Sequence, residues 1–243
     1  MTVNLVFVHG GGQGAWVWDE TIAALVAQSP RIRCLALDVP GCGTKRDRDI
    51  ASLDIGDIAR ELVAEIADMQ SVVLVGHSQA GMLMPRMVEY SPGSFARLVY
   101  VTCSAPPPGT SIMQLIGEGI QGRRDDCVGW ALDEKTTPML ELFREMFCTG
   151  MSADDQETFL AKLLHDTWPP NTYTQVDWRY DHLTAVPASY VVCARDRALP
   201  PAWQQRFAAQ LGVERVLHID AGHQVMNTHP EVLAEVLLAE CRQ

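Results

Sequence analysis

The sequence lacks any apolar run long enough to cross a bilayer. Its longest apolar stretches, such as Leu5 to Val8 and Ser71 to Val75, fall far below the roughly 18 residues that a spanning helix needs. The first apolar run has no basic segment before it and no small-residue cleavage site after it, so a signal peptide is not predicted either. We therefore expect no membrane partner and, by default, a cytoplasmic location.

Basic residues are scarce as well. The chain has 19 Lys and Arg against 30 Asp and Glu, giving a net charge of −11, and its basic residues gather only in short pairs such as Arg123-Arg124. Proteins that bind polyanions need a basic face to attract them. The charge pattern therefore excludes nucleic acid and anionic membranes as expected partners.

Paired cysteines are also missing. The seven cysteines are odd in number and scattered, without a C-x-x-C pair, which is typical neither of a disulfide framework nor of a zinc site. Cys34, Cys103 and Cys193 stand in apolar, strand-like runs, where a free cysteine is usually a small buried hydrophobe. No metal site is predicted.

Regular alternation of strand and helix patterns is what the sequence does contain. The chain has 243 residues, of which 47% are hydrophobic, and we therefore expect one soluble domain. Helical periodicity is clearest over Ile55–Met69 and Glu231–Glu240. Such alternation predicts an α/β fold, with a mostly parallel sheet and helices on both faces. The predicted strands are Leu5–Val8, Ile32–Leu37, Val72–Val75, Leu98–Val101, Tyr190–Cys193 and Val216–Ile219.

One stretch breaks the alternation. Residues 110–179 contain helix-like segments around Pro138–Phe147 and Asp154–His165 but no convincing strand. An insertion between two strands of such a sheet would lie over the carboxyl ends of the strands, where ligands bind. We expect residues 110–179 to form a mainly helical cap on a core made of residues 1–109 and 180–243. Extra helices packed elsewhere against the core are the alternative.

The stretch VLVGHSQAGM, from Val73 to Met82, predicts a nucleophile. Ser78 follows an apolar strand and precedes a helical segment, which is the context of a nucleophile elbow. The residues two before and two after such a serine must be small. Gly76 is, Ala80 adds only one methyl group, and Gly81 should give further slack.

A serine nucleophile needs a base, and the base needs an orienting acid. His223 follows the last predicted strand through a short turn, and Asp196 ends the strand before it. The chain order Ser78, Asp196, His223 is that of α/β-hydrolase triads. Asp220 is a rival acid, and an ion pair of Asp196 with a neighbouring arginine, Arg195 or Arg197, is the structural alternative.

The glycine-rich stretch HGGGQGAW, His9 to Trp16, follows the first strand. An acyl-transfer site needs backbone N–H groups aimed at the oxygen that becomes negative, and glycines allow a close approach. We predict Gly11 and Gln79 as oxyanion donors, the latter because it follows the nucleophile. A nucleotide site is not predicted, because G-K-[ST] is absent and the spacing departs from G-x-G-x-x-G.

Together these motifs carry a resemblance. HGGGQGAWVW, LALDVPGCG, VGHSQAG, ARDRALPP and AGHQVMNTHPE resemble the α/β-hydrolase superfamily, in the branch of plant methylesterases, hydroxynitrile lyases and related bacterial esterases. The resemblance implies the same triad and oxyanion donors, no cofactor, and a structural role for Asp38. Hydroxynitrile lyases of that branch carry threonine and lysine where this chain has Gly10 and Gln224, which disfavours lyase chemistry. Haloalkane dehalogenases use aspartate where this chain has Ser78.

The function expected is that of a cofactor-independent serine carboxylesterase acting on small or medium apolar esters. Lactones, thioesters, carbon–carbon bonds and perhydrolysis on the same triad remain alternatives, and a ligand receptor without activity is another. The oligomeric state is not readable. We expect a kink or a tightened first turn at Pro85. Substrate contacts are predicted at Gly10, Trp130, Phe143 and Phe147, and the cap should also bring near the site Met139, Leu140, Leu142, Met146 and Trp168.

Overall fold

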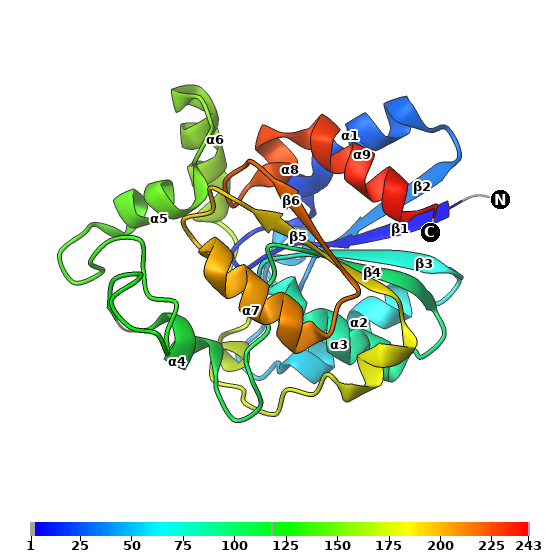
Figure 1. Ribbon diagram of the computed structural model, residues 1–243, viewed down its shortest axis with the longest axis horizontal. Helices are drawn as coiled ribbons and strands as arrows, with labels where there is room; N and C mark the ends of the chain where they lie inside the picture. The colour runs from blue at the N-terminus through cyan, green and yellow to red at the C-terminus, as the bar shows by residue number, and fades with distance from the viewer. Residues whose placement is uncertain (1–2, 118, 243) are drawn as a thin grey trace.

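A parallel sheet forms the centre of the molecule. The computed structural model describes residues 3–117 and 119–242, and within them the sheet has six strands in the order β2-β1-β3-β4-β5-β6 (Figure 1). Every neighbouring pair is parallel. The predicted α/β fold is therefore confirmed, and each predicted strand is found. The strands are β1 Val3–Val8, β2 Ile32–Leu37, β3 Val72–His77, β4 Phe95–Val101, β5 Ala188–Cys193 and β6 Arg215–Ile219.

Helices cover both faces of this sheet. Alternate side chains of β1 point to opposite faces, so that Leu5 and Phe7 pack in one core cluster and Val6 and Val8 in the other. Burying each such side chain stabilises the fold by about 1.5–3 kcal/mol. None of the helices in the described ranges is both long and apolar enough to span a membrane. One face carries α1 Asp19–Gln28, α8 Val225–Thr228 and α9 Pro230–Glu240, and the other carries α2 Ile55–Glu65, α3 Ala80–Tyr90 and α7 Pro201–Leu211 (Figure 1).

The helix α2 is shorter than its periodicity predicts. It begins with a capping box, in which the Asp54 side chain accepts from the Asp57 N–H and the Asp57 side chain accepts from the Asp54 N–H. It ends at Glu65, because Ile66 leaves the helical conformation at φ −114° and ψ 16°. Ile66 and Met69 still extend the apolar stripe, since both are buried in the turn that follows.

The strand order reverses between β1 and β3. From β1 the chain passes outward to β2 and then returns to β3 on the other side of β1. At such a switch point the connections leave in opposite directions and open a crevice at the carboxyl ends of the strands. Val8 pairs with Gly76 near those ends, so the loop after β1 and the turn after β3 emerge side by side.

Most of the chain between β4 and β5 lies beyond the carboxyl ends of the strands. Figure 1 shows α4, α5 and α6 gathered at that end of the sheet, whereas the last part of the segment, with η4, runs back to the amino end of β5. Within the described residues this segment contains no strand, only an isolated bridge between Ile120 and Trp130. The helices here are α4 Ile112–Ile116, α5 Met139–Phe147 and α6 Ala153–Leu163, followed by the 3-10 turns η3 Pro170–Tyr173 and η4 Asp181–Ala185.

Pro85 lies inside α3, and the helix begins with a tightened turn. The N–H groups of Gly81 and Met82 donate to the carbonyls three residues earlier, those of Ser78 and Gln79, at 3.1 Å each. Bonds of this 3-10 type shorten the first turn. Of the two outcomes expected, a kink or a tightened first turn, the helix shows a tightened first turn, directly after Ser78.

Candidate active site

Ser78 occupies a strained turn between β3 and α3. Its φ is +54°, in the left-handed region that residues other than glycine rarely adopt. Its N–H donates to the Val101 carbonyl at 3.2 Å, and its own carbonyl accepts from the Ser104 N–H at 2.9 Å. The end of β4 therefore holds the strained backbone from both sides. Strain of this kind costs about 1–3 kcal/mol and concentrates at functional sites.

Close packing explains the small residues around Ser78. A Cβ on Gly76 would overlap the Met84 sulfur and come within 3.0 Å of the Ala80 Cβ. The methyl group of Ala80 itself is fully buried without such an overlap. Gly81 does not provide slack, which corrects the sequence-based expectation. A Cβ there would overlap the Ser104 carbonyl oxygen and lie 2.7 Å from the Cys103 Cβ, so Gly81 lets two backbone segments meet.

His223 and Asp196 form a buried pair. His223 Nδ1 lies 2.7 Å from Asp196 Oδ2, and the two residues are 1% and 5% exposed. Because a carboxylate only accepts, Nδ1 carries the proton and Nε2 is left as the base. His223 and Ser78 line the same cavity. The structure thus brings together all three residues that the sequence selected, from the ends of β3, β5 and β6.

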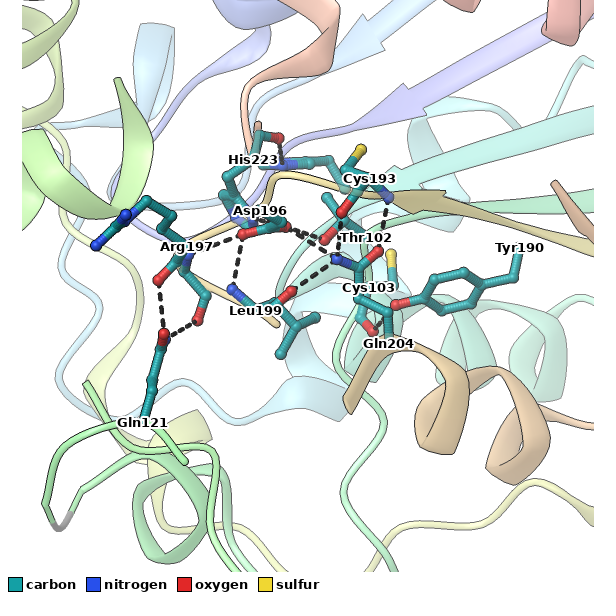
Figure 2. Close-up of polar contacts among 12 residues, drawn as sticks. Thr102, Cys103, Gln121, Tyr190, Cys193, Asp196, Arg197, Leu199, Gln204 and His223 are labelled. Carbon is teal, nitrogen blue, oxygen red and sulfur yellow. Dashed lines mark hydrogen bonds and ion pairs between the residues drawn. The ribbon is translucent and has the colours of Figure 1, made fainter. Parts of the chain in front are cut away.

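Four further donors hold the Asp196 carboxylate (Figure 2). Oδ1 accepts from the backbone N–H groups of Ala198 and Leu199, each at 2.8 Å. Oδ2 accepts from the Thr102 hydroxyl at 2.5 Å and, more weakly, from Gln204 Nε2 at 3.4 Å. Sequence reasoning missed Thr102 and Gln204. Thr102 could have been found as a hydroxyl directly after β4, whereas nothing in the sequence places Gln204 of α7 against β5.

The rival assignments for the acid do not match the contacts. Asp220 forms an ion pair with Arg195 at 3.0 Å, and its side chain is 80% exposed. Arg197 pairs with Glu145. Neither arginine is the partner of Asp196, whose contacts are those given above.

His77, next to Ser78, contacts both the backbone and the ring of His223. Its Nε2 lies 3.1 Å from the His223 main-chain oxygen, and the two rings are 4.6 Å apart. A carbonyl oxygen only accepts, so Nε2 carries the proton, and the buried Nδ1 has no partner in the described part of the chain. Burial, followed by the nearby His223, holds the pKa of His77 well below its ordinary value. His77 is therefore a neutral donor.

A second buried histidine anchors the glycine-rich loop after β1. His9 Nε2 accepts from the Val39 N–H at 3.0 Å, which leaves Nδ1 as the donor to the Gly10 carbonyl at 2.8 Å. Burial lowers the pKa of His9 and keeps it neutral. The N–H groups of Gly11 and Gln79, the predicted oxyanion donors, make no hydrogen bond to any described residue.

The loop after β1 and the elbow lie next to a cavity of about 500 Å³. This volume is within the range of small-molecule sites. Its wall is mainly apolar and aromatic, with few charged groups. Among the described residues, no three His, Cys, Asp or Glu side chains form a potential metal site. Within residues 3–117 and 119–242, four lining residues hold a buried polar atom that meets no partner: Gln13 Oε1, Gln79 Oε1, Trp130 Nε1 and Trp168 Nε1.

The predicted substrate contacts divide into two groups. Trp130, Phe143 and Phe147 line the cavity, as do Met146 and Trp168 from the wider set. Gly10 does not. It is buried beneath the nucleophile, where a Cβ would lie 2.8 Å from the Ser78 Cβ. Three residues of α5 from the wider set do not line the cavity: the side chains of Met139 and Leu140 are largely exposed, and that of Leu142 is buried.

Asp166 was not predicted, although it joins the helical segment to two loops of the core. Its carboxylate accepts from Trp16 Nε1 at 3.0 Å and the Gly43 N–H at 3.0 Å, and it pairs with Arg46 at 3.2 Å. Trp16 belongs to the loop after β1, and Gly43 and Arg46 to the loop after β2. Asp38 joins the same loops, accepting from the Ala15 N–H at 2.6 Å and from Thr44.

A parallel sheet with a strained serine at its switch point and a histidine–carboxylate pair beside it defines a class of protein, the α/β hydrolases. The chain belongs to the alpha/beta hydrolase family, whose model matches residues 5–236.

Individual relatives agree with the predicted branch. The chain is 25% identical to polyneuridine aldehyde esterase of Rauvolfia serpentina, over 97% of this chain and 94% of that protein. It is 27% identical to methylesterase 9 of Arabidopsis thaliana, over 97% and 96%. An extracellular α/β-hydrolase from a Paenibacillus species has the same fold, with a TM-score of 0.79, 20% identity and coverage of 99% and 100%. The resemblance to the esterase branch is confirmed.

Proposed function

We propose that this α/β hydrolase is a serine carboxylesterase that cleaves small or medium apolar esters without a cofactor. The observation that carries the proposal is the strained Ser78 beside the 2.7 Å pair of His223 and Asp196, in one cavity. This reaction agrees with the names of two relatives, polyneuridine aldehyde esterase and methylesterase 9.

The proposed mechanism assigns one role to each group. His223 Nε2 takes the Ser78 proton as the hydroxyl oxygen attacks the ester carbonyl, and Asp196 holds the imidazole and stabilises its cation. The free N–H groups of Gly11 and Gln79 bind the oxyanion. His223 then protonates the leaving alcohol. In the second half it takes a proton from a water that attacks the acyl group, and it returns that proton to the Ser78 oxygen as the acid leaves.

The segment of residues 110–179 is proposed as the cap of this site. It contributes Trp130, Phe143 and Phe147 to the cavity wall, and Asp166 joins it to the core. An apolar wall of this size favours an ester with an aromatic or branched group over a short alkyl ester. Lactones and thioesters meet the same groups and stay as alternatives. The absence of a lysine at Gln224 argues against cyanohydrin cleavage.

One variant tests the proposal directly. Ser78→Ala removes the nucleophile, and the fold should persist because the substitution deletes a single oxygen. We expect turnover of p-nitrophenyl esters and of methyl esters of aromatic acids to fall by about 10⁴-fold or more, and labelling by a fluorophosphonate probe to disappear. Esterase activity at the wild-type level in Ser78→Ala would contradict the mechanism. A wild-type protein that the probe does not label would favour a receptor without activity.

A further inference from the structure

Gln79 faces the cavity with its side chain as well as with its backbone. Its N–H is one proposed oxyanion donor, and its amide lies across Gly11, the other. A Cβ on Gly11 would come within 2.5 Å of the Gln79 Cδ and 2.7 Å of its Nε2. The side-chain amide therefore lies beside the position where the carbonyl group of an ester would bind.

The amide oxygen of Gln79 is an unused acceptor. Oε1 is buried and receives no hydrogen bond from any described residue, and Tyr173 lines the same cavity. A buried acceptor without a donor costs about 1–3 kcal/mol. Such groups are rare in native proteins and call for a partner. In a cavity wall, a ligand can supply it.

Trp168 adds an unused donor to the cavity. Its indole is 2% exposed and lines the cavity, and Nε1–H meets no acceptor within the described residues. The ring lies edge-on to His9 at 5.9 Å, so it stands next to the loop that carries Gly11. Gln79, Tyr173 and Trp168 together offer an acceptor, a hydroxyl and a donor. A hydroxyl group, which donates and accepts at once, complements this set.

The polar set lies apart from the wall beside His223. Phe147 packs on the His223 ring at 5.4 Å and shares a small cluster with Phe143. Trp168 and Tyr173 instead pack into the main core cluster. The leaving alcohol must face His223 to receive its proton, which assigns it to the phenylalanine wall. The acyl part then meets the polar set.

The charges around the cavity select a neutral group. No lysine or arginine is among the described lining residues. The one carboxylate there, that of Asp166, already has Trp16, Gly43 and Arg46 as partners. A carboxylate on the substrate would find no cation, whereas a hydroxyl needs none.

We propose that the side chains of Gln79 and Trp168 select esters whose acyl part carries a hydroxyl group on the first or second carbon from the carbonyl. The Gln79 Oε1 accepts from that hydroxyl, and Trp168 Nε1 donates to it. This inference rests on the proposed esterase function and goes beyond it in naming the acid.

The test compares three matched esters: methyl 3-phenylpropanoate and its 2-hydroxy and 3-hydroxy derivatives. For the wild-type protein we expect kcat/KM for at least one hydroxy ester to exceed that of the parent by about tenfold. Gln79→Leu and Gln79→Met, which both remove the amide, should bring this ratio to about 1. Trp168→Phe removes the N–H and should lower it severalfold. Gln70→Leu, an exposed position at the opposite end of β3, should keep the wild-type ratio.

Equal kcat/KM values for the three esters in the wild-type protein would overturn the inference. So would an unchanged ratio in whichever of the two Gln79 variants folds, as judged by its thermal melt. Labelling of Ser78 by a fluorophosphonate separates the possible failures. A labelled protein that does not discriminate, or that cleaves none of the three esters, refutes only the selection, whereas a protein that is not labelled refutes the proposed function itself.

Discussion

The ring of His77 donates through Nε2 to the main-chain oxygen of His223, 3.1 Å away. His77→Leu would leave that carbonyl without a donor, so we expect kcat to fall by about tenfold and stability by about 1–3 kcal/mol. His77→Gln can place an amide N–H near the same point and should restore most of the activity. Steady-state kinetics and urea unfolding of both variants check this. Equal losses in the two variants would show that the hydrogen bond is not the cause.

The buried histidines predict how stability depends on pH. Burial lowers the pKa of both His9 and His77 below the ordinary value of 6.5. Below pH 6.5 the unfolded chain therefore binds protons that the folded protein does not, and folding loses up to about 1.4 kcal/mol per pH unit for each group. Well above pH 6.5 both histidines are neutral in the folded and the unfolded state, so this loss of stability is absent there. Urea unfolding at pH 7.5, 6.0 and 5.0 should show this fall, with a shallower slope in His77→Gln. Parallel slopes would contradict the assignment.

Substitution of Asp196 and substitution of Asp220 should have very different effects on activity. In Asp196→Asn the amide oxygen stays with the N–H groups of Ala198 and Leu199, so the NH₂ group turns toward His223 Nδ1 and forces the wrong tautomer. We expect kcat to fall by about 10⁴-fold. Asp220→Asn, which changes an exposed ion pair, should keep activity within about twofold. Comparable losses in both variants would remove Asp196 as the orienting acid.

The small residues of the elbow give a further contrast. Ala80→Gly removes one buried methyl group and should cost about 1–2 kcal/mol with little change in ester turnover. Gly81→Ala forces a Cβ onto the Ser104 backbone, which cannot move aside as a flexible side chain could. We expect a loss of roughly 2 kcal/mol or more, together with reduced turnover. Urea unfolding and esterase assays compare the two variants, and a Gly81→Ala protein as stable as the wild type would contradict this packing argument.

The sequence was sufficient wherever position along a strand determined position in space. Ser78, Asp196 and His223 each follow an apolar run, and parallel strands bring their carboxyl ends to one edge of the sheet. Directions of individual side chains were not available in this way. Gly10 and Gly11 are neighbours in the chain, yet Gly10 packs against Ser78 and His77 whereas Gly11 packs against the side chain of Gln79. In the same way, the contacts of Gln204 depend only on how α7 packs on β5, where its side chain bonds the backbone of Cys193.

The helices between β4 and β5 show the same limit. Apolar periodicity predicted α5, and Phe143 and Phe147 of this helix line the cavity. Met139 and Leu140 belong to the same apolar pattern but lie at the first turn, which projects into solvent. Periodicity defines a face of a helix and not where that face ends. That end depends on tertiary packing.

Asp166 links the wall of the cavity, to which it belongs, with the loop after β1. The same carboxylate holds Trp16, in the stretch that begins with His9, and the Gly43 N–H of the β2 loop. An exchange of the segment between β4 and β5 for a foreign one, in evolution or by design, must therefore keep an acceptor at this point. Otherwise a change meant to alter substrate range would also disturb the loop that carries Gly11. A substitution in this segment that removes the acceptor should therefore change the substrate range and the catalytic rate at the same time.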